Sequence, residues 1–179
     1  MPRHIHPKGE FFAPKDARVF VKLSVHETPS IGKGLFSEEL VYKSQIIAVD
    51  GGLVLSSVED VPKHMSYCVL IDKDTYLGPT DFNTPDMLSL INHSCHPNIK
   101  RIGGLVFSAK KTIQPGEQLT IDYAPLVAGV KDWQMECHCG AEKCRKIITG
   151  NDWKNKILAS MLWEEWLPHI QSAIIRADS

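Results

Sequence analysis

Three closely spaced cysteines place the strongest constraint on how this chain can fold. Cys137, Cys139 and Cys144 fall within eight residues, and Gly140 among them allows the backbone to turn tightly around an ion. Three thiolates would leave a tetrahedral zinc ion one ligand short. A loop of free thiols without a metal is the alternative, and the close spacing makes it the less favoured one.

The fourth ligand must come from elsewhere in the chain. Cys95 is the favoured candidate, while His138 and Cys68, which lies in an apparent strand, are competitors. A closed set of four thiolates leaves no coordination position for a substrate, so such a site is structural rather than catalytic. With Cys95 as a ligand, the site would tie residues 137–144 to the middle of the chain.

Cys95 belongs to a second unusual stretch, Asn92-His93-Ser94-Cys95-His96-Pro97-Asn98. This stretch follows the apolar run 87–91, which 84–86 should start as a short helical turn with Thr84 as its N-cap. Few surface loops end a hydrophobic segment with so many short hydrogen-bonding side chains. We expect a functional site here, although His93 taken alone would be a structural histidine.

Length and charge set the broad class. The 179 residues suffice for one domain with a core, and the net charge of −1 provides no overall basic field to attract nucleic acid. No apolar run approaches membrane-spanning length, and the start has no apolar signal core. An odd count of five cysteines favours a reducing compartment. The expected setting is intracellular: cytoplasmic in a bacterium, nuclear or cytoplasmic in a eukaryote.

Short apolar runs separated by turn residues indicate a mostly β domain. We expect a strand at 19–25 and hairpins formed by 46–49 with 53–55, by 67–71 with 76–77 and by 99–102 with 105–107. The tail differs, because from Asp152 its apolar residues recur at helical spacing up to Trp166. We expect Asn151 to cap this helix and Pro168 to end or kink it.

Four motifs occur in a fixed order along the chain. Gly32-Lys33-Gly34-Leu35-Phe36 precedes the stretch 92–98, which is followed by 115–123 with Asp122-Tyr123 at its end and then by Cys-x-Cys-Gly-x3-Cys-Arg. In this order, over roughly residues 18 to 148, the chain resembles the SET-domain protein lysine methyltransferases. The resemblance implies small β-sheets in which the segments of Asn92 and Tyr123 thread together as a pseudoknot.

The resemblance also implies a division of the chain and a set of site residues. The SET domain would span 18–124, a post-SET zinc segment 125–149, and a C-terminal helical extension packed on the domain 150–179. S-adenosylmethionine would bind in one face, and the target lysine would enter from the opposite face to meet the channel residue Tyr123. The expected cofactor-binding residues are Ile31, Gly32, Lys33, Tyr67, Asn92 and His93; the expected zinc ligands are Cys95, Cys137, Cys139 and Cys144.

The implied function is transfer of a methyl group from S-adenosylmethionine to the side-chain amine of a lysine in a protein or peptide. Direct nucleic-acid and membrane partners are not expected. Ile121, two residues before Tyr123, has no hydroxyl to hold a water, which favours di- or trimethylation. The alternatives are a catalytically silent SET-type module that binds a peptide or protein, and an unrelated zinc-stapled scaffold.

Some positions depart from the family pattern. Ser89 stands where relatives often have Arg, and Lys146 stands where many have Gly. Several relatives cover the cofactor with an aromatic residue just after the last cysteine, but Thr149 and Gly150 occupy that region here. Trp153 is the candidate replacement. These departures are what keep the silent module in consideration.

Overall fold

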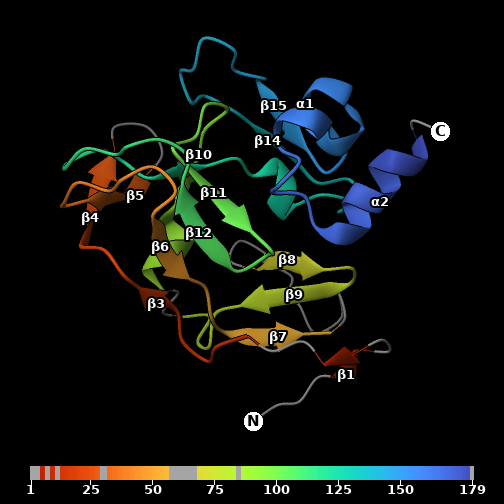
Figure 1. Cartoon of the computed structure of the whole chain (residues 1–179), viewed down its shortest axis with the longest axis horizontal. Coiled ribbons are helices and arrows are strands. Elements are labelled where there is room, and N and C mark those ends of the chain that lie inside the picture. The colour runs from red at the N-terminus through yellow and green to blue at the C-terminus, as the bar shows by residue number, and fades with distance from the viewer. Residues whose placement is uncertain are drawn as a thin grey trace.

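The computed structural model is a mostly β molecule with several small sheets and short C-terminal helices (Figure 1). It describes residues 13–28, 32–56, 68–83 and 86–177, together with the backbone of two short strands near the N-terminus, β1 (Ile5–His6) and β2 (Gly9–Glu10). The mostly β class expected from the sequence is confirmed. Within the described residues, no helix is both long and apolar enough to cross a membrane.

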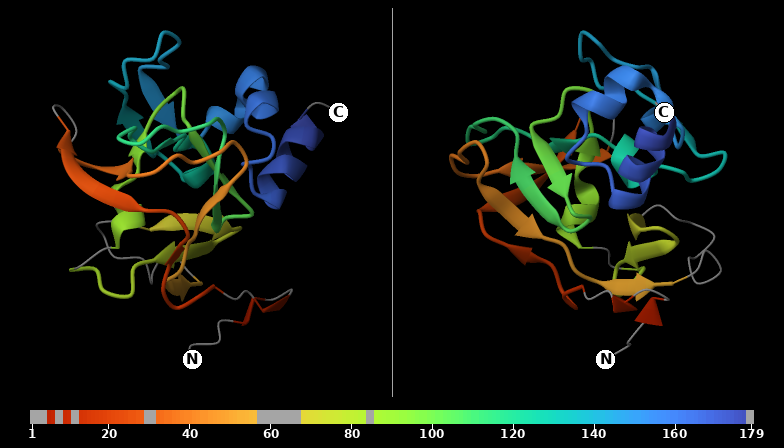
Figure 2. Two further views of the ribbon diagram at one scale, coloured as in Figure 1. Left: turned by 60° about the vertical axis from the view of Figure 1, so that its left-hand side comes forward. Right: turned by 45° about the vertical axis from the view of Figure 1, so that its right-hand side comes forward.

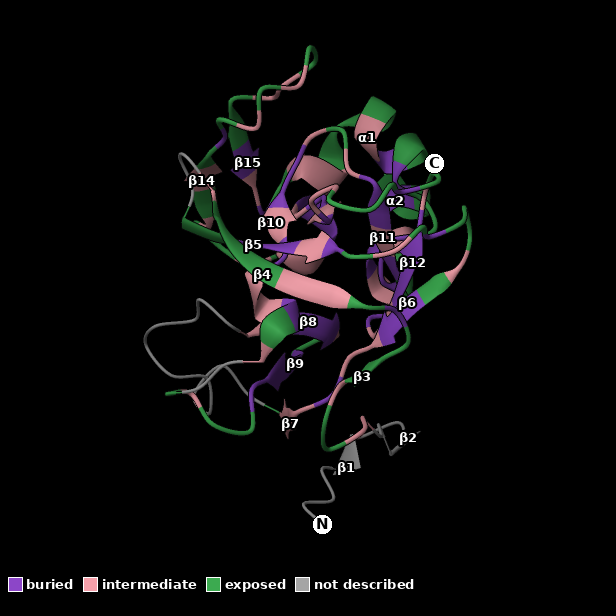
Figure 3. Cartoon of the chain, turned by 90° about the vertical axis from the view of Figure 1, so that its left-hand side faces the viewer, coloured by how far each residue is buried: buried purple, intermediate pink, exposed green. Residues whose placement is uncertain are grey.

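The largest sheet has four strands in the order β11-β12-β6-β3. The strands are β3 (Arg18–Val19), β6 (Ile46–Val49), β11 (Ile99–Ile102) and β12 (Val106–Ala109). The antiparallel pairing of β11 with β12 confirms the hairpin expected around Gly103-Gly104. Most residues of β11, β12 and β6 are buried or half-buried (Figure 3), and side chains such as Ile47, Ile99 and Phe107 help to form the main hydrophobic core.

The hairpin expected between 46–49 and 53–55 is wrong. β6 pairs with β12 and β3, whereas β7 (Leu53–Leu55) pairs with β9 (Thr75–Gly78) in another sheet. The glycines between them serve a crossing rather than a turn: a Cβ on Gly51 would lie 2.5 Å from the backbone of Asp16. The chain therefore passes under the N-terminal segment as it leaves one sheet for the next.

The two remaining antiparallel pairs frame the rest of the domain. β4 (Leu23–Thr28) pairs with β5 (Gly32–Ser37), and β8 (Val69–Asp72) pairs with β9, which confirms the expected hairpin around 72–74. The single strand expected at 19–25 is instead split into β3 and β4. Its expected buried face fails as well, since Val19 and Val25 are exposed and only Val21 among its alternate positions lies in the core.

A short parallel pair joins the two motifs that carry the resemblance. β10 (Asn92–His93) pairs with β13 (Thr120–Ile121), so that Asn92 lies opposite Thr120 and His93 opposite Ile121. The buried Asn98 reinforces the pair: its Nδ2 donates to the Gln118 carbonyl over 2.7 Å, and its Oδ1 accepts from the Thr120 N–H over 2.8 Å. This arrangement agrees with the threaded segments expected of a SET fold.

Short helices flank these strands. The 3-10 helix η3 (Met87–Leu90) leads into β10, and its N-cap is Asp86 rather than Thr84, which lies outside the described residues. After β13 come η4 (Ala124–Leu126), the pair β14 (Gln134–Glu136) and β15 (Ile147–Thr149), η5 (Asp152–Lys154), α1 (Lys156–Met161) and α2 (Pro168–Ala177).

The tail forms two α-helices beside β14 and β15 (Figure 2). Contrary to expectation, Pro168 begins α2, a position where the missing N–H of proline costs nothing. Asn155, not Asn151, caps α1 through its side chain. Part of the expected apolar stripe is exposed, because Ile157 and Met161 face away from the domain with 73% and 62% of their surface accessible.

The other half of the stripe forms a second core. Leu162 and Trp166 pack with Ile170 of α2 against residues that precede the tail, including Ala128, Cys137 and Ile148. The indole N–H of Trp166 donates to the Ala159 carbonyl over 3.1 Å, so the buried ring leaves no polar atom unsatisfied. The helices of the tail and the cysteine-bearing segment therefore share one hydrophobic cluster.

Candidate active site and metal centre

The four cysteines expected to bind zinc converge in space. The sulfur atoms of Cys95, Cys137, Cys139 and Cys144 all lie within 4.8 Å of one another. The sulfur of Cys137 is 3.7 Å from that of Cys95 and 3.6 Å from that of Cys144. Zinc–sulfur bonds of about 2.3 Å in a tetrahedron place the sulfurs about 3.8 Å apart. The cluster therefore has the donor set and spacing to hold a zinc ion.

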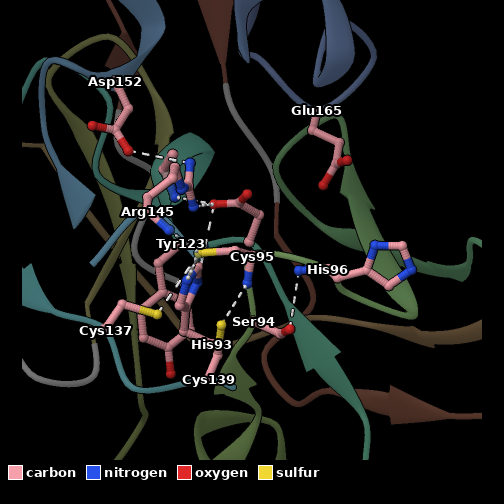
Figure 4. Close-up of polar contacts among 12 residues, drawn as sticks. His93, Ser94, Cys95, His96, Tyr123, Cys137, Cys139, Arg145, Asp152 and Glu165 are labelled. Atoms are coloured by element: carbon pink, nitrogen blue, oxygen red, sulfur yellow. Dashed lines mark hydrogen bonds and ion pairs between the residues drawn. The ribbon is translucent and has the colours of Figure 1, made fainter. Parts of the chain in front are cut away.

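The geometry also decides between the competing fourth ligands. Cys68 lines a different cavity, and His138 is largely exposed, with its Nε2 3.5 Å from Oε2 of Glu136. Cys95 brings its own support: its N–H points to the sulfur of Cys139 over 3.4 Å, and the Arg145 N–H points to its sulfur over 3.4 Å (Figure 4). Backbone donors of this kind stabilise thiolate ligands.

One thiol of the cluster is already poised as a thiolate. Burial alone would raise the pKa of Cys139, but hydrogen bonds from the backbone N–H groups of Cys95 and Ala141 outweigh burial and lower this pKa to about 6. At neutral pH the Cys139 sulfur therefore carries the negative charge that a metal ligand needs.

His93 connects the cysteine cluster to the second motif. Its Nδ1 accepts a hydrogen bond from the backbone N–H of Tyr123 over 3.1 Å, and its Nε2 lies 3.4 Å from the Cys95 sulfur. Because Nδ1 is an acceptor, the neutral ring must carry its proton on Nε2 and direct it at that sulfur. Burial lowers the pKa of His93, which favours this neutral form. His93 is therefore tied into the fold on both sides of its ring.

Tyr123 holds its hydroxyl in a defined direction. The hydroxyl donates to the carbonyl oxygen of Ile91 over 2.8 Å, and burial raises the pKa of the phenol to about 12. The group is thus a neutral hydroxyl whose oxygen keeps free lone pairs. It can orient a donor brought close to it, but it cannot act as a base at neutral pH.

Arg145 anchors this region, although the sequence patterns gave no reason to single it out beyond its place after Cys144. Its guanidinium donates to Oδ1 of Asp122 over 2.6 Å and lies 3.1 Å from Oδ2 of Asp152 (Figure 4). Asp122 also accepts the Ala124 N–H over 3.0 Å. The carboxylate beside Tyr123 is therefore fully engaged in holding the segments together.

A cavity of about 490 Å³ opens on the side of β10 and β13 that faces the cysteines. Asn92 and His93, both expected to bind the cofactor, line it. Gln118 also lines it and keeps a buried Nε2 without a hydrogen-bond partner. Such an atom marks where a polar ligand would bind. The lining is completed by Thr28, Ser94, Thr120, Tyr123, Met135, Glu136, Cys137, His138 and Cys139.

The other residues expected to bind the cofactor lie around this cavity or outside the described residues. Lys33 is adjacent, because its carbonyl oxygen accepts a hydrogen bond from Asn92 Nδ2 over 2.9 Å. Gly32 begins β5 one residue earlier. Ile31 and Tyr67 lie outside the described residues. Trp153, the candidate cover, packs in the second core and is absent from the described lining of the cavity.

Gly34 shows why the glycine turn must lie close to this cavity. A Cβ there would be 2.4 Å from Nε2 of Gln118 and 3.1 Å from Nδ2 of Asn92. Both are polar atoms of cavity-lining residues, so any side chain at position 34 would push them from their places. The glycine motif of the sequence is thus explained by contact with the polar wall of the cavity.

A second cavity, of about 560 Å³, lies on the other side of Tyr123. The hairpin of β8 and β9 forms one wall, and the segment from Tyr123 to Met135 forms another. Ile91, Ile121, Leu126, Val127 and Trp133 make the surroundings of Tyr123 largely apolar. Tyr123 and Met135 line both cavities and so form the partition between them. Trp133, which no motif marked, contributes the largest apolar side chain to this wall.

Comparison with known proteins agrees with the fold and these motifs. The SET domain family model matches residues 32–124, just over half of the chain. The H3 lysine-9 specific histone-lysine N-methyltransferase KMT1 of Fusarium mangiferae is 28% identical over 167 residues, covering 72% of this chain and 48% of that protein. Mouse histone-lysine N-methyltransferase EHMT1 is 28% identical over 166 residues, covering 85% of this chain and 13% of that protein.

Solved structures give the same result. KRYPTONITE in complex with mCHH DNA, an H3(1-15) peptide and SAH matches with a TM-score of 0.58 and 27% identity, over 73% of this chain and 30% of that one. The chain spans less than half of the length of these relatives. Distant similarity to histone-lysine N-methyltransferases supports methyltransferase activity, for which the family uses S-adenosylmethionine. By its motifs, its fold and the match over residues 32–124, the chain belongs to the SET domain family.

Proposed function

We propose that this protein transfers methyl groups from S-adenosylmethionine to the side-chain amine of a lysine in a protein or peptide. One observation carries the proposal: Tyr123 and Met135 line both cavities. A methyl donor in the cavity beside Asn92 and a lysine in the cavity beside β8 would therefore meet at Tyr123. Methyl transfer is an in-line displacement, which needs this kind of approach from opposite sides.

The bound cofactor supplies an electrophilic methyl group, and the chain's own residues supply the geometry. An apolar wall around Tyr123 disfavours the charged ammonium form and so promotes the neutral amine that can attack. The Tyr123 hydroxyl, held by the Ile91 carbonyl, can accept a hydrogen bond from the amine and orient its lone pair. Asp122 is engaged by Arg145 and does not serve as a base.

The proposal assigns roles to the residues around each site. Cys95, Cys137, Cys139 and Cys144 would hold one structural zinc ion; Ile31, Gly32, Lys33, Tyr67, Asn92, His93 and Gln118 would hold the cofactor. Residues 18–124 would form the SET domain, 125–149 the post-SET segment and 150–179 an extension packed on both. We further propose a nuclear or cytoplasmic location.

The substrate peptide would bind as an added strand. β8 is an edge strand of the sheet β7-β9-β8, and the second cavity lies between this hairpin and the segment after Asp122. A peptide placed there could form main-chain hydrogen bonds with the sheet edge while the cavity receives its side chains. The names of the relatives favour a histone tail as the substrate.

A catalytically silent SET-type module is the second candidate. Ser89 lines the second cavity with a small side chain, and the described lining of the cofactor cavity has no aromatic cover besides Tyr123 and His138. A module of this kind would bind the peptide without transferring a methyl group.

A methyl-transfer assay separates the two candidates. The protein is incubated with a broad protein extract and S-adenosylmethionine labelled in its methyl group, beside Tyr123→Phe as the matched control. Label on lysine with the wild type alone supports the enzyme. Binding of S-adenosylmethionine in a calorimeter without any labelled product would instead support the silent module.

A further inference from the structure

Arg101 is a buried cation with unused hydrogen-bond donors. Only 2% of its surface is accessible, and its Nη2 donates to Oδ2 of Asp50 over 2.5 Å. Its Nε and Nη1 have no hydrogen-bond partner among the described residues. One face of the guanidinium is covered by Phe107, with 5.4 Å from Cζ to the ring centroid, but a ring face accepts little from in-plane N–H groups.

These donors belong to the second cavity rather than to a sealed core. Arg101 lines that cavity together with Asp50, Asp86 and Ser89. Buried N–H groups left without an acceptor are costly, by roughly 1–3 kcal/mol each. An Arg with three such hydrogens facing a cavity therefore predicts an acceptor that binds there.

Asp86 contributes the complementary property. Its Oδ1 accepts both hydrogen bonds of the η3 cap, from the N–H groups of Leu88 and Ser89 at 2.8 and 3.3 Å. No described residue donates to its Oδ2. The two carboxylates and one guanidinium give this end of the cavity a net charge of −1, so a further carboxylate would be repelled. A further cation would leave the Arg101 donors unsatisfied.

An uncharged group that both accepts and donates satisfies every one of these atoms. A carboxamide or hydroxyl oxygen can accept from Arg101 while its N–H or O–H donates to Asp86. We propose that this end of the cavity is a specificity subsite for an Asn, Gln, Ser or Thr side chain close in sequence to the target lysine. The proposal rests on the proposed function, since it takes this cavity as the one that receives the substrate.

The variant Asp86→Asn tests the subsite without removing the cap, because Asn caps helices as well as Asp does. It replaces the free Oδ2 acceptor by an N–H donor and brings the net charge of the subsite to zero. The variant should therefore prefer Glu or Asp. Asp74→Asn is the matched control: it has the same charge change at an exposed turn residue with φ of 58°, which Asn also tolerates, and it does not line the cavity.

The probe is a library of peptides with a central lysine in which each neighbouring position carries Gln, Ser, Glu, Arg or Ala in turn. Both label transfer and retention on the immobilised protein with S-adenosylhomocysteine are measured. At one position, the wild type and Asp74→Asn should favour Gln or Ser over Glu by about tenfold, and Asp86→Asn should reverse this preference.

The two readouts keep the subsite and the enzyme apart. Retention that follows this pattern without any label transfer would support the subsite while rejecting the methyltransferase. Label transfer or retention that is equal for all neighbouring residues, or a preference that Asp86→Asn leaves unchanged, would overturn the subsite, with water then satisfying Arg101. A preference for Arg would overturn it as well.

Discussion

The backbone N–H of Tyr123 donates a hydrogen bond to Nδ1 of His93 over 3.1 Å, across a sequence separation of 30 residues. The bond runs beside the parallel pair of β10 and β13, so the position of the phenol depends on a ring that also approaches the Cys95 sulfur. The cysteine cluster, the cofactor cavity and the partition between the two cavities are thus linked through one imidazole.

Removing the Tyr123 hydroxyl should affect turnover far more than folding. Tyr123→Phe loses the hydrogen bond to the Ile91 carbonyl and the oxygen that orients the amine, so we expect kcat to fall about 10²-fold or more. Cofactor affinity, measured by calorimetry, should change by less than about threefold. Full activity of Tyr123→Phe on a verified substrate would show that the channel assignment is wrong.

The ionisation of Tyr123 should be late and visible by absorption. Burial raises its pKa to about 12, so its phenolate should form only well above the ordinary range near 10. In a titration followed at the phenolate absorption band, the difference between the wild type and Tyr123→Phe should remain near zero up to about pH 11. A difference that develops around pH 10 would mean that the phenol is not buried in solution.

The cysteine cluster should bind one zinc ion per chain and support the segment around it. Because metal binding at such sites is coupled to folding, removal of zinc forfeits on the order of 10 kcal/mol of binding energy. After treatment with a chelator, amide hydrogens of residues 125–149 should exchange faster, while those of the sheet β11-β12-β6-β3 should remain protected. Elemental analysis of protein purified without chelator should give one zinc, and Cys68→Ser should leave that count unchanged. An absence of stoichiometric metal would reject the site.

Gly34→Ala should weaken the cofactor site. The added Cβ would lie 2.4 Å from Nε2 of Gln118 and 3.1 Å from Nδ2 of Asn92, so both cavity-lining side chains must move. We expect the affinity for S-adenosylmethionine, measured by calorimetry, to fall about tenfold or more. Gly103→Ala is the control: its φ of 57° should reduce stability by about 1 kcal/mol, but open space surrounds its Cβ position, so the affinity should not change. Equal affinities for the two variants would contradict the contact argument.

Ile121 should set how many methyl groups are added. It is buried and lines the second cavity beside Tyr123, where the neighbouring side chains are also apolar. Without a second hydroxyl to anchor a water, the space can accept a methylated amine. We expect di- or trimethyl-lysine from the wild type and a shift toward monomethyl-lysine in Ile121→Tyr, both read by mass spectrometry under excess enzyme. A wild type that stops at one methyl group would reject this argument.

The local patterns of the sequence were enough to identify the family, the mostly β class and the four clustered cysteines. These features depend on residues near one another in the chain: thiols within one loop, a glycine turn before a strand, an Asp-Tyr pair at a strand end. Their chemistry is constrained by spacing alone, so the sequence displays it. The hairpins at 67–77 and 99–107 were predictable for the same reason, since a short turn forces its flanking strands to pair.

Only the tertiary structure decided which distant segments meet. The expected hairpin at 46–55 failed because both strands found other partners, and nothing in its glycines distinguishes a turn from a crossing. Pro168 begins a helix instead of ending one because the chain had already left the helical conformation at Leu162. Gln118, Arg101 and Arg145 owe their roles to neighbours far along the chain. Burial and pairing across such distances depend on the path of the whole backbone, which no local pattern records.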